Sequence, residues 1–328
     1  MQRLLDSIRA SARFLQRHPR TRKGLQLALV TITVAFCVWA VRHEWSKAGS
    51  RLEHARPGYL ALALLALSAY YLIFILGWIR MLAAWGISVP YRVALQAEMV
   101  SMLAKYIPGG VWTPAARAVA LRRAAGVTDT PTVLASILVE AALSAISGVI
   151  VFVVSLAWVR GVDAPLPALI LFAILLASLL HPRIFRPLSH KLLKPFGAKA
   201  IEPLPFPVTI GLLLFYCGTW VIGGVAVWFL LRSVEATPTL STIPFLGGVA
   251  AVGAIVAVLA VFTPSGLGAR EASMYGLLLA ITSAGPALGV TLLNRLAITL
   301  VEIALFGIGL IAWRIGRRAA ELQASRSP

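Results

Sequence analysis

The sequence predicts an all-α polytopic membrane protein with about six membrane-crossing helices and two re-entrant helical hairpins in an inverted repeat. Hydrophobic residues make up 59% of the 328 residues and charged residues only 13%, and the mean hydropathy is +0.86. These values lie outside the range of soluble globular proteins. Apolar runs of about 20 residues recur, each long enough to cross about 30 Å of hydrocarbon. Two further apolar regions are interrupted by Pro and Gly at their centres.

The first 24 residues are rich in arginine, and their apolar residues fall close to helical spacing. We therefore predict a basic amphipathic segment over 1–24 that lies on the membrane surface. Because this leader is long and no small-residue cleavage site follows the next apolar run, we expect a retained signal-anchor helix. A single integral-membrane domain is predicted over 25–315, followed by a cytoplasmic tail over 316–328.

The uninterrupted apolar runs give the predicted crossings. They are expected at residues 25–41, 58–80, 131–158, 165–181, 207–231 and 286–313. A basic, partly amphipathic connector follows the fourth crossing, over 182–203.

Two regions, 93–125 and 242–284, each read as two half-helices around a break, which predicts a re-entrant hairpin. The breaks contain Pro108, Gly109 and Gly110 in the first region and Pro264, Gly266 and Gly268 in the second. Irregular backbone at membrane depth is tolerated only where it is buried in protein or lines a wet cavity.

With six crossings and two re-entrant hairpins, both termini face the cytoplasm, and most of the 30 Lys and Arg residues then lie on the cytoplasmic side. The loop over 42–56 is the exception, because it places four basic residues outside. Two full crossings by the second hairpin would preserve the same distribution. The charge pattern therefore predicts the sidedness of the loops and leaves the depth of the hairpins open.

A short repeat relates the two broken regions. "MLAKYIPGG" (102–110) and "VLAVFTPSG" (258–266) share Leu, Ala, Pro and Gly at a common offset of 156 residues. In each half, an Arg-bearing helix and then a long span with a glutamate follow the break, which gives repeat halves of about 93–158 and 242–313. Three crossings separate the hairpins, so they enter from opposite faces. Paired broken helices of this kind mark the substrate sites of transporters.

Broken helices expose backbone N–H groups and a positive dipole end, and a nearby arginine adds a fixed charge, so together they favour an anion. The candidate substrate-binding residues are the ionisable groups of these regions. They are Arg270, Glu271, Arg295, Glu302, Glu140, Lys105 and Arg117. Ionisable groups at membrane depth are functional by default, and Arg270 is the first candidate for the headgroup.

Each candidate also has a structural alternative. Glu271 with Arg270 forms a pair that stabilises the turn, or Glu271 pairs with Arg295. On one helical face, seven residues apart, lie Arg295 and Glu302. We expect them either to hold the hairpin in place or to line a path for the headgroup. Glu140 either hydrogen-bonds a neighbour or serves a proton relay.

Lys105 and Glu98 are seven residues apart and are expected to pair across two turns. Arg117, together with Arg122 and Arg123, also fits a role in topology and headgroup anchoring.

Other function classes find little support. The net charge of +18 suits anionic lipid headgroups better than nucleic acid, because the basic residues lie in loops and tails. No metal-ligand cluster, P-loop, HExxH or GxSxG motif is present. We therefore expect no cofactor, no metal and no enzymatic activity.

"KYIPGGVW" and "TPSGLGARE", with the later "LLNRLAITLVE", resemble the lysylphosphatidylglycerol synthase transmembrane-region family over about 25–315. The first motif departs from the commoner Pro-Gly-x-x-Gly-Glu form. The resemblance implies an integral-membrane module that translocates lipids, which some members fuse to a soluble aminoacyl-transferase domain. We expect that domain to be absent here, so the resemblance supports lipid movement and not aminoacylation.

The sequence thus predicts a multi-pass protein of the bacterial inner membrane that moves an anionic or phosphate-bearing lipid, of the phospholipid or polyprenyl-phosphate type, by alternating access. One alternative is a non-transporting membrane partner of a lipid-modifying enzyme such as a glycosyltransferase. Another is a membrane-embedded transferase with Glu140 or Glu271 as its acid–base residue. The expected partners are membrane lipids with anionic headgroups, with homo-oligomers and an enzyme partner as open alternatives.

Overall fold

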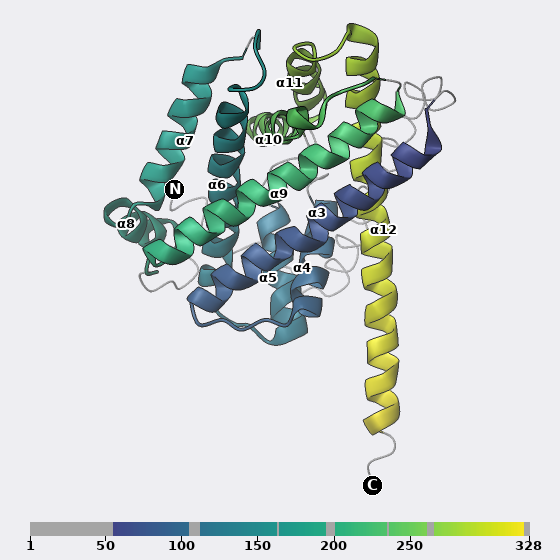
Figure 1. The fold of residues 1–328 in the computed structure, drawn as a ribbon. Coiled ribbons are helices and arrows are strands. Elements are labelled where there is room, and N and C mark those ends of the chain that lie inside the picture. Colours follow the sequence, from purple (N-terminus) through teal and green to yellow (C-terminus); the bar gives the residue numbers. More distant parts are fainter. Residues whose placement is uncertain are drawn as a thin grey trace.

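The computed structural model describes residues 55–104, 112–162, 164–194, 201–234, 236–260 and 266–324, and within this part of the chain every regular element is a helix (Figure 1). The elements are α3 (Pro57–Ala84), α4 (Tyr91–Ala104), α5 (Trp112–Ala125), α6 (Thr130–Ser155), α7 (Leu166–Leu180), α8 (Pro182–Leu193), α9 (Phe206–Ser233), the short 3₁₀ helix η2 (Leu240–Thr242), α10 (Ile243–Leu259), α11 (Ala269–Leu278) and α12 (Ala284–Ala324). The prediction of an all-α membrane protein is confirmed.

Five helices are long and apolar enough to cross a membrane. They are Pro57–Ala84, Thr130–Ser155, Phe206–Ser233, Leu240–Leu259 and Ala284–Gly309. Four of them match predicted crossings, and the fifth contains α10. The basic segment 1–24 and the predicted crossing 25–41 lie outside the described residues.

The predicted crossing over 165–181 differs from the structure. Its helix, α7, has only 15 residues and is about 22 Å long, which is short of the roughly 30 Å of hydrocarbon. After His181 the chain bends by 76° into α8, and only this bent pair meets the length and hydropathy expected of one span. Pro182 explains the bend, because a proline disfavours helical backbone in the residue before it; His181 is extended, with ψ of 135°.

The broken regions are helix pairs, as their sequences indicate. Three of the four helices are short: α4 and α5 have 14 residues each and α11 has 10. At 1.5 Å per residue, helices of these lengths span about 15–21 Å and cannot cross the hydrocarbon alone. Because α10 with η2 is long enough to cross, the second region also has the length of a full span, and re-entrance of both regions stays a prediction.

The order of elements repeats along the chain. A 28-residue span, a broken helix pair and a long span make up α3–α4–α5–α6, and the same order returns in α9–α10–α11–α12. The contacts repeat as well. The two helices of each broken pair pack together, α6 packs on α10, and reciprocally α12 packs on α4.

The leading spans of the two halves, α3 and α9, lie side by side and run antiparallel (Figure 1). At one end the Arg56 N–H donates to the Ser233 carbonyl over 3.0 Å. At the other end Trp85 Nε1 donates to the Glu202 carbonyl over 2.8 Å. Corresponding helices of opposite direction are what an inverted repeat requires, and the inversion of the whole half stays a prediction.

Helices α6, α9 and α10 approach one another through glycines. A Cβ added to Gly224 on α9 would lie 2.2 Å from the Ile243 carbonyl oxygen and 2.6 Å from the Gly247 amide nitrogen. A Cβ on Gly148 would lie 2.5 Å from the Ala251 Cβ. Small residues let helix backbones meet closely in a membrane, where van der Waals packing drives association. These three helices therefore form the tightly packed centre of the molecule.

The last helix, α12, is also the longest, with 41 residues. Its N-terminal part packs on α3, α4, α9 and α11. Its C-terminal part extends well away from the other helices (yellow in Figure 1).

Candidate functional site

Two groups of buried ionisable residues lie in the repeated halves. The first, the Arg117 cluster, consists of Glu98, Ser101, Arg117, Glu140 and Tyr216. Arg117 on α5 forms ion pairs with both Glu98 on α4 and Glu140 on α6. Its Nε donates to Ser101 Oγ over 3.5 Å, and the Tyr216 hydroxyl on α9 donates to Glu140 Oε1 over 3.3 Å. Four helices therefore meet at one guanidinium.

The Arg117 cluster is shielded from its surroundings. Glu98, Arg117 and Glu140 are 7%, 4% and 4% exposed. The guanidinium carbon of Arg117 lies 4.7 Å from the ring centroid of Trp78 on α3, a cation–π contact. The Trp78 indole in turn donates to Ser136 Oγ over 2.8 Å, which holds the ring in place.

These contacts bear on two expectations. Glu98 pairs with Arg117 on the following helix, and its expected pair with Lys105 stays a prediction, because Lys105 lies outside the described residues together with Pro108, Gly109 and Gly110. Arg117 is a buried ion-pair partner and not a surface anchor, unlike Arg122 and Arg123, which are exposed. Glu98 is the site residue that the sequence reasoning placed in a local pair only.

The second group, the Arg295 cluster, consists of Arg270, Glu271 and Arg295. Arg295 Nη1 on α12 lies 3.6 Å from Glu271 Oε1 on α11. Glu271 Oε2 accepts a hydrogen bond of 2.7 Å from the Gly268 amide, which caps the N-terminus of α11. Gly266 and Gly268 have φ angles of 70° and 84°, a backbone region that glycine enters without strain. Pro264 lies outside the described residues.

Arg270 is half-buried at the first turn of α11. Its aliphatic stem packs toward α10, since a Cβ on Gly253 would lie 3.4 Å from the Arg270 Cγ. Its charge acts on the hydroxyls of Tyr70 and Tyr71 on α3. Among the residues that the structure describes, its guanidinium takes part in neither an ion pair nor a hydrogen bond, in contrast to Arg117.

Tyr70 and Tyr71 connect the two clusters. Tyr71 donates to Glu302 Oε1 on α12 over 2.6 Å, and Glu302 is only 1% exposed. Tyr70 lies within electrostatic range of Arg270 and also of Glu98 and Glu140. A half-buried pair of tyrosines on α3 thus lies between the ionisable groups of the two halves.

The two clusters occupy equivalent places in the repeat, but the acidic and basic residues exchange helices between the halves. In the first half, the helix after the break supplies Arg117 and the long span supplies Glu140. In the second half, the helix after the break supplies Glu271 and the long span supplies Arg295. With all groups ionised, the Arg117 cluster carries a net charge of −1 through its two glutamates, whereas the Arg295 cluster carries +1.

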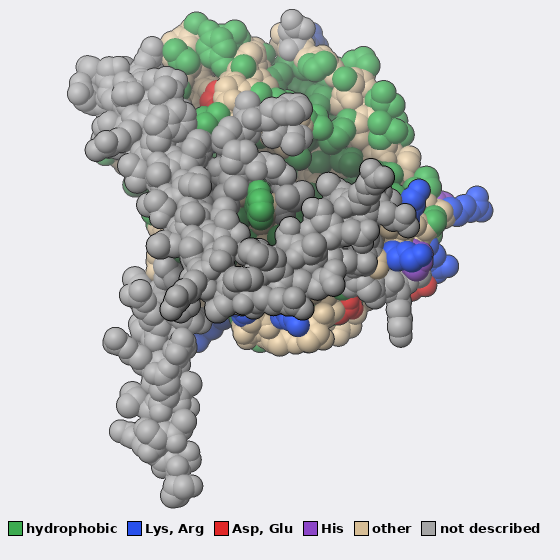
Figure 2. Space-filling model, turned by 180° about the vertical axis from the view of Figure 1, so that it is seen from behind, with side chains coloured by type: hydrophobic (Ala, Val, Ile, Leu, Met, Phe, Trp, Pro, Cys, Tyr) green, Lys and Arg blue, Asp and Glu red, His purple; other side chains and the backbone are tan. Residues whose placement is uncertain are grey.

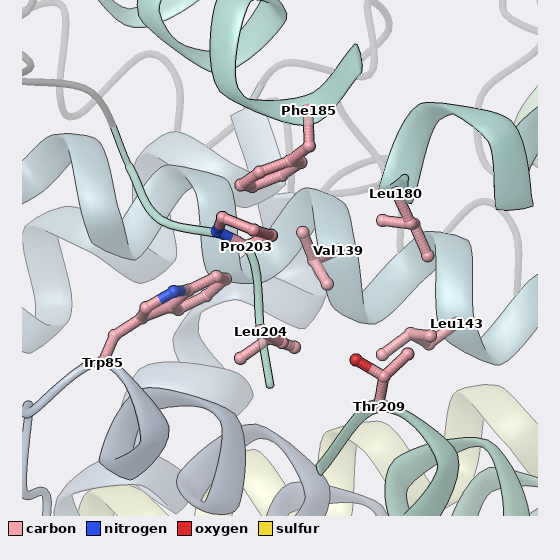
Figure 3. Close-up of a pocket in the computed structure, with 8 residues that line it drawn as sticks. All are labelled: Trp85, Val139, Leu143, Leu180, Phe185, Pro203, Leu204 and Thr209. Atoms are coloured by element: carbon pink, nitrogen blue, oxygen red, sulfur yellow. The ribbon is translucent and has the colours of Figure 1, made fainter. Parts of the chain in front are cut away.

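The remaining features are a pocket and a basic surface region. A small pocket beside α6 is lined almost entirely by apolar side chains, among them Phe185 of α8 (Figure 3). The described residues include no group of His, Cys, Asp and Glu suited to a metal ion. Basic residues and both described histidines gather on α8, at one edge of the face in Figure 2.

The profile of the family described as "Lysylphosphatidylglycerol synthase TM region" matches residues 25–307. The chain belongs to this family. Comparison with individual curated proteins gives no match. As a member of the lysylphosphatidylglycerol synthase TM region family, the protein is a multi-pass membrane protein with a lipid-related function. Both clusters lie inside the matched region.

Proposed function

We propose that this protein transports an anionic or phosphate-bearing lipid across a membrane by alternating access, with Arg270 as the headgroup-binding residue. The observation that carries the proposal is the half-buried guanidinium of Arg270 at the glycine break before α11. It belongs to a cluster of net charge +1 within a membrane protein. A lipid phosphate would supply the compensating charge, and arginine suits phosphate because its planar fork donates two parallel hydrogen bonds.

The surroundings of Arg270 support this role. Glu271 is engaged by Gly268 and Arg295, so it does not neutralise Arg270 fully. Tyr70 lies within electrostatic range and offers a hydroxyl donor for a phosphate oxygen, whereas the Tyr71 hydroxyl donates to Glu302. The lipid tail would remain in the bilayer while the headgroup passes between the two halves, which change their relative orientation.

We propose transport without chemistry on the lipid, so the protein would not be an enzyme. The two acid–base candidates are both engaged: Glu140 by Arg117 and Tyr216, and Glu271 by Gly268 and Arg295. Incubation of the pure protein with candidate donors and lipids, followed by mass spectrometry, should reveal no new lipid species. A new species would revive the transferase hypothesis.

The transport test uses purified protein in vesicles that contain headgroup-labelled phosphatidylglycerol. A membrane-impermeant reagent quenches outer-leaflet label, and the rate of further quenching reports lipid movement. We expect the wild type to exceed protein-free vesicles by at least roughly tenfold, the change that corresponds to 1.4 kcal/mol of barrier. Arg270→Gln should lose most of this acceleration. Labelled phosphatidylcholine and a labelled polyprenyl phosphate, tested in parallel, distinguish the lipid classes.

Arg232→Gln is the matched control. Arg232 is also half-buried, but it lies at the end of α9, where it donates to the Tyr59 hydroxyl over 3.2 Å. Its replacement should leave transport unchanged. Absence of acceleration by the wild type with every anionic lipid, with or without an ion gradient, would exclude the proposal. Equal transport by Arg270→Gln and Arg232→Gln would exclude Arg270 as the headgroup residue.

A second candidate function, a non-transporting partner of a lipid-modifying enzyme, is favoured by α8. This helix presents exposed Arg183 and Lys191 around the buried Phe185, and it follows α7 at a sharp bend. Such a basic, amphipathic helix can bind an enzyme or anionic headgroups. Under this alternative, Arg183→Glu with Lys191→Glu abolishes function in cells, whereas Arg270→Gln does not. If Arg270 binds the transported headgroup, Arg270→Gln abolishes function in cells, whereas Arg183→Glu with Lys191→Glu does not.

For the location, we propose a bacterial inner membrane with both termini in the cytoplasm. The basic residues of α8 then lie on the cytoplasmic side, in agreement with the positive-inside rule. Cysteine labelling in intact cells and in inverted membrane vesicles tests this orientation. A residue on α8 should react only in inverted vesicles.

A further inference from the structure

The Arg117 cluster has an unusual ratio of charges for a site inside a membrane. One guanidinium serves two carboxylates, Glu98 and Glu140, and all three side chains are more than nine-tenths buried. If both glutamates were ionised, the cluster would hold one uncompensated negative charge. An uncompensated buried charge is costly, and two carboxylates that share a site do not ionise equally easily.

Among the described residues, no second cation forms an ion pair with Glu98 or Glu140. On α9 the facing titratable group is Tyr216, which donates to Glu140. On α3 it is Tyr70, within range of both glutamates. On α12, which packs on α4, the buried ionisable groups are Glu302, which accepts from Tyr71, and Arg295, which pairs with Glu271. Helices α7 and α10, which pack on α6, contain no ionisable side chain.

From this geometry we infer that the Arg117 cluster is a proton-binding site, in which Glu98 and Glu140 together hold one exchangeable proton beside Arg117. One proton brings the cluster to zero net charge. Its partners can accommodate both forms, since Ser101 and Tyr216 carry hydroxyls that donate or accept. Buried carboxylates that exchange a proton are a recurring device of membrane transporters.

The placement of the cluster links the proton to the broken helix pair. Arg117 joins α4 and α5 to α6, and Tyr216 adds α9. Loss of the proton would strengthen the attraction of the second carboxylate for Arg117 and so favour one arrangement of α4 and α5 against α6. This step rests on the proposed function: the proton bound here would drive or gate lipid movement through the second half.

Infrared difference spectroscopy tests the inference without any transport assay. Purified wild-type protein in lipid nanodiscs is titrated with acid and base, and the C=O stretch of protonated carboxylic acids is followed. We expect one band that titrates reversibly and is lost in Glu98→Gln and in Glu140→Gln, because the single remaining carboxylate is neutralised by Arg117. Glu202→Gln, which alters an exposed pair with Arg186, should keep the band.

Loss of the band in the glutamine variants could also result from misfolding, so a second kind of variant keeps both carboxyl groups and changes only a hydrogen bond to one of them. Tyr216→Phe removes one hydrogen bond to Glu140 and should move the midpoint of the band, whereas Tyr59→Phe should not. A wild-type protein with no titrating band would overturn the inference, as would a band that all these variants leave unchanged. A titrating band in a protein that moves no lipid would support proton binding and reject the proposed function. Lipid transport by a protein that lacks the titrating band would support the proposed function and reject proton binding.

When lipid movement is observed, its response to a pH gradient gives an independent measurement. The wild type should move lipid at a rate that changes severalfold with an imposed gradient. Glu140→Gln should lose that response, while Glu202→Gln should keep it. An equal response of the wild type and Glu140→Gln to the pH gradient would show that the Arg117 cluster does not couple the proton to transport.

Discussion

Substitution of Gly224 by alanine should weaken the packing of α9 on α10. The new Cβ would lie 2.2 Å from the Ile243 carbonyl oxygen, 2.6 Å from the Gly247 nitrogen and 3.0 Å from the Gly247 Cα. All three are backbone atoms, so no side chain can rotate away. To reach an ordinary contact the helices must separate by roughly 1 Å, and close-packed interiors resist such a shift. Overpacking of this kind costs about 1–3 kcal/mol.

The matched control is Gly218→Ala on the same helix. No atom lies within 4 Å of a Cβ at Gly218, and both substitutions share the gain of about 0.5–1 kcal/mol in helix propensity. The difference between the two variants therefore isolates the clash. Unfolding in mixed micelles with increasing denaturing detergent, followed by tryptophan fluorescence, should place Gly224→Ala about 1–3 kcal/mol below Gly218→Ala. Equal stability of the two variants would refute the close approach of α9 and α10.

Three further substitutions are checked by the same unfolding measurement. Gly268→Ala should cost about 1–2 kcal/mol, because alanine is strained at a φ of 84° although its Cβ would meet no atom. Ser136→Ala should cost about 1–3 kcal/mol, because the buried indole N–H of Trp78 loses its acceptor. Arg186→Ala should cost less than about 1 kcal/mol, since Arg186 and Glu202 are 56% and 66% exposed.

Two controls accompany these variants. Gly276→Ala on α11 has neither the positive φ of Gly268 nor a neighbouring atom within 4 Å, so it should not destabilise the protein. Ser178→Ala removes an exposed hydroxyl that bonds only within its own helix and should be nearly neutral. A loss at Gly276 as large as at Gly268, or a neutral Ser136→Ala, would contradict the reasoning.

Most of the fold could be predicted from the sequence, because long apolar runs and proline or glycine breaks are local signals. The bounds of α3 and α6 follow directly from such runs. The span at 165–181 was harder to predict. Hydropathy continues to the end of α7, but Pro182 bends the chain by 76° after only 15 residues, so that only the bent pair of α7 and α8 has the length of a span.

The candidate site was predictable where partners lie near a break and less so where they depend on tertiary packing. Arg295 was the first partner to test for Glu271, because it is the first basic residue of the span that follows that turn. Glu98 was assigned to Lys105 because seven residues make two helical turns. The structure pairs Glu98 with Arg117, which reaches Glu98 only after α5 folds back on α4. No periodicity within one helix encodes that contact.

The length of α12 has a mechanical consequence. From Arg295 to Ala324 the helix is about 44 Å long, and its whole length of about 60 Å is roughly twice the thickness of the hydrocarbon. If α12 tilts as one rigid rod about Arg295, it acts as a lever. A tilt of roughly 10° at the pivot would displace the far end by about 8 Å. A distance probe on the last turn of α12 would thus report small rearrangements around Glu271 as a much larger displacement.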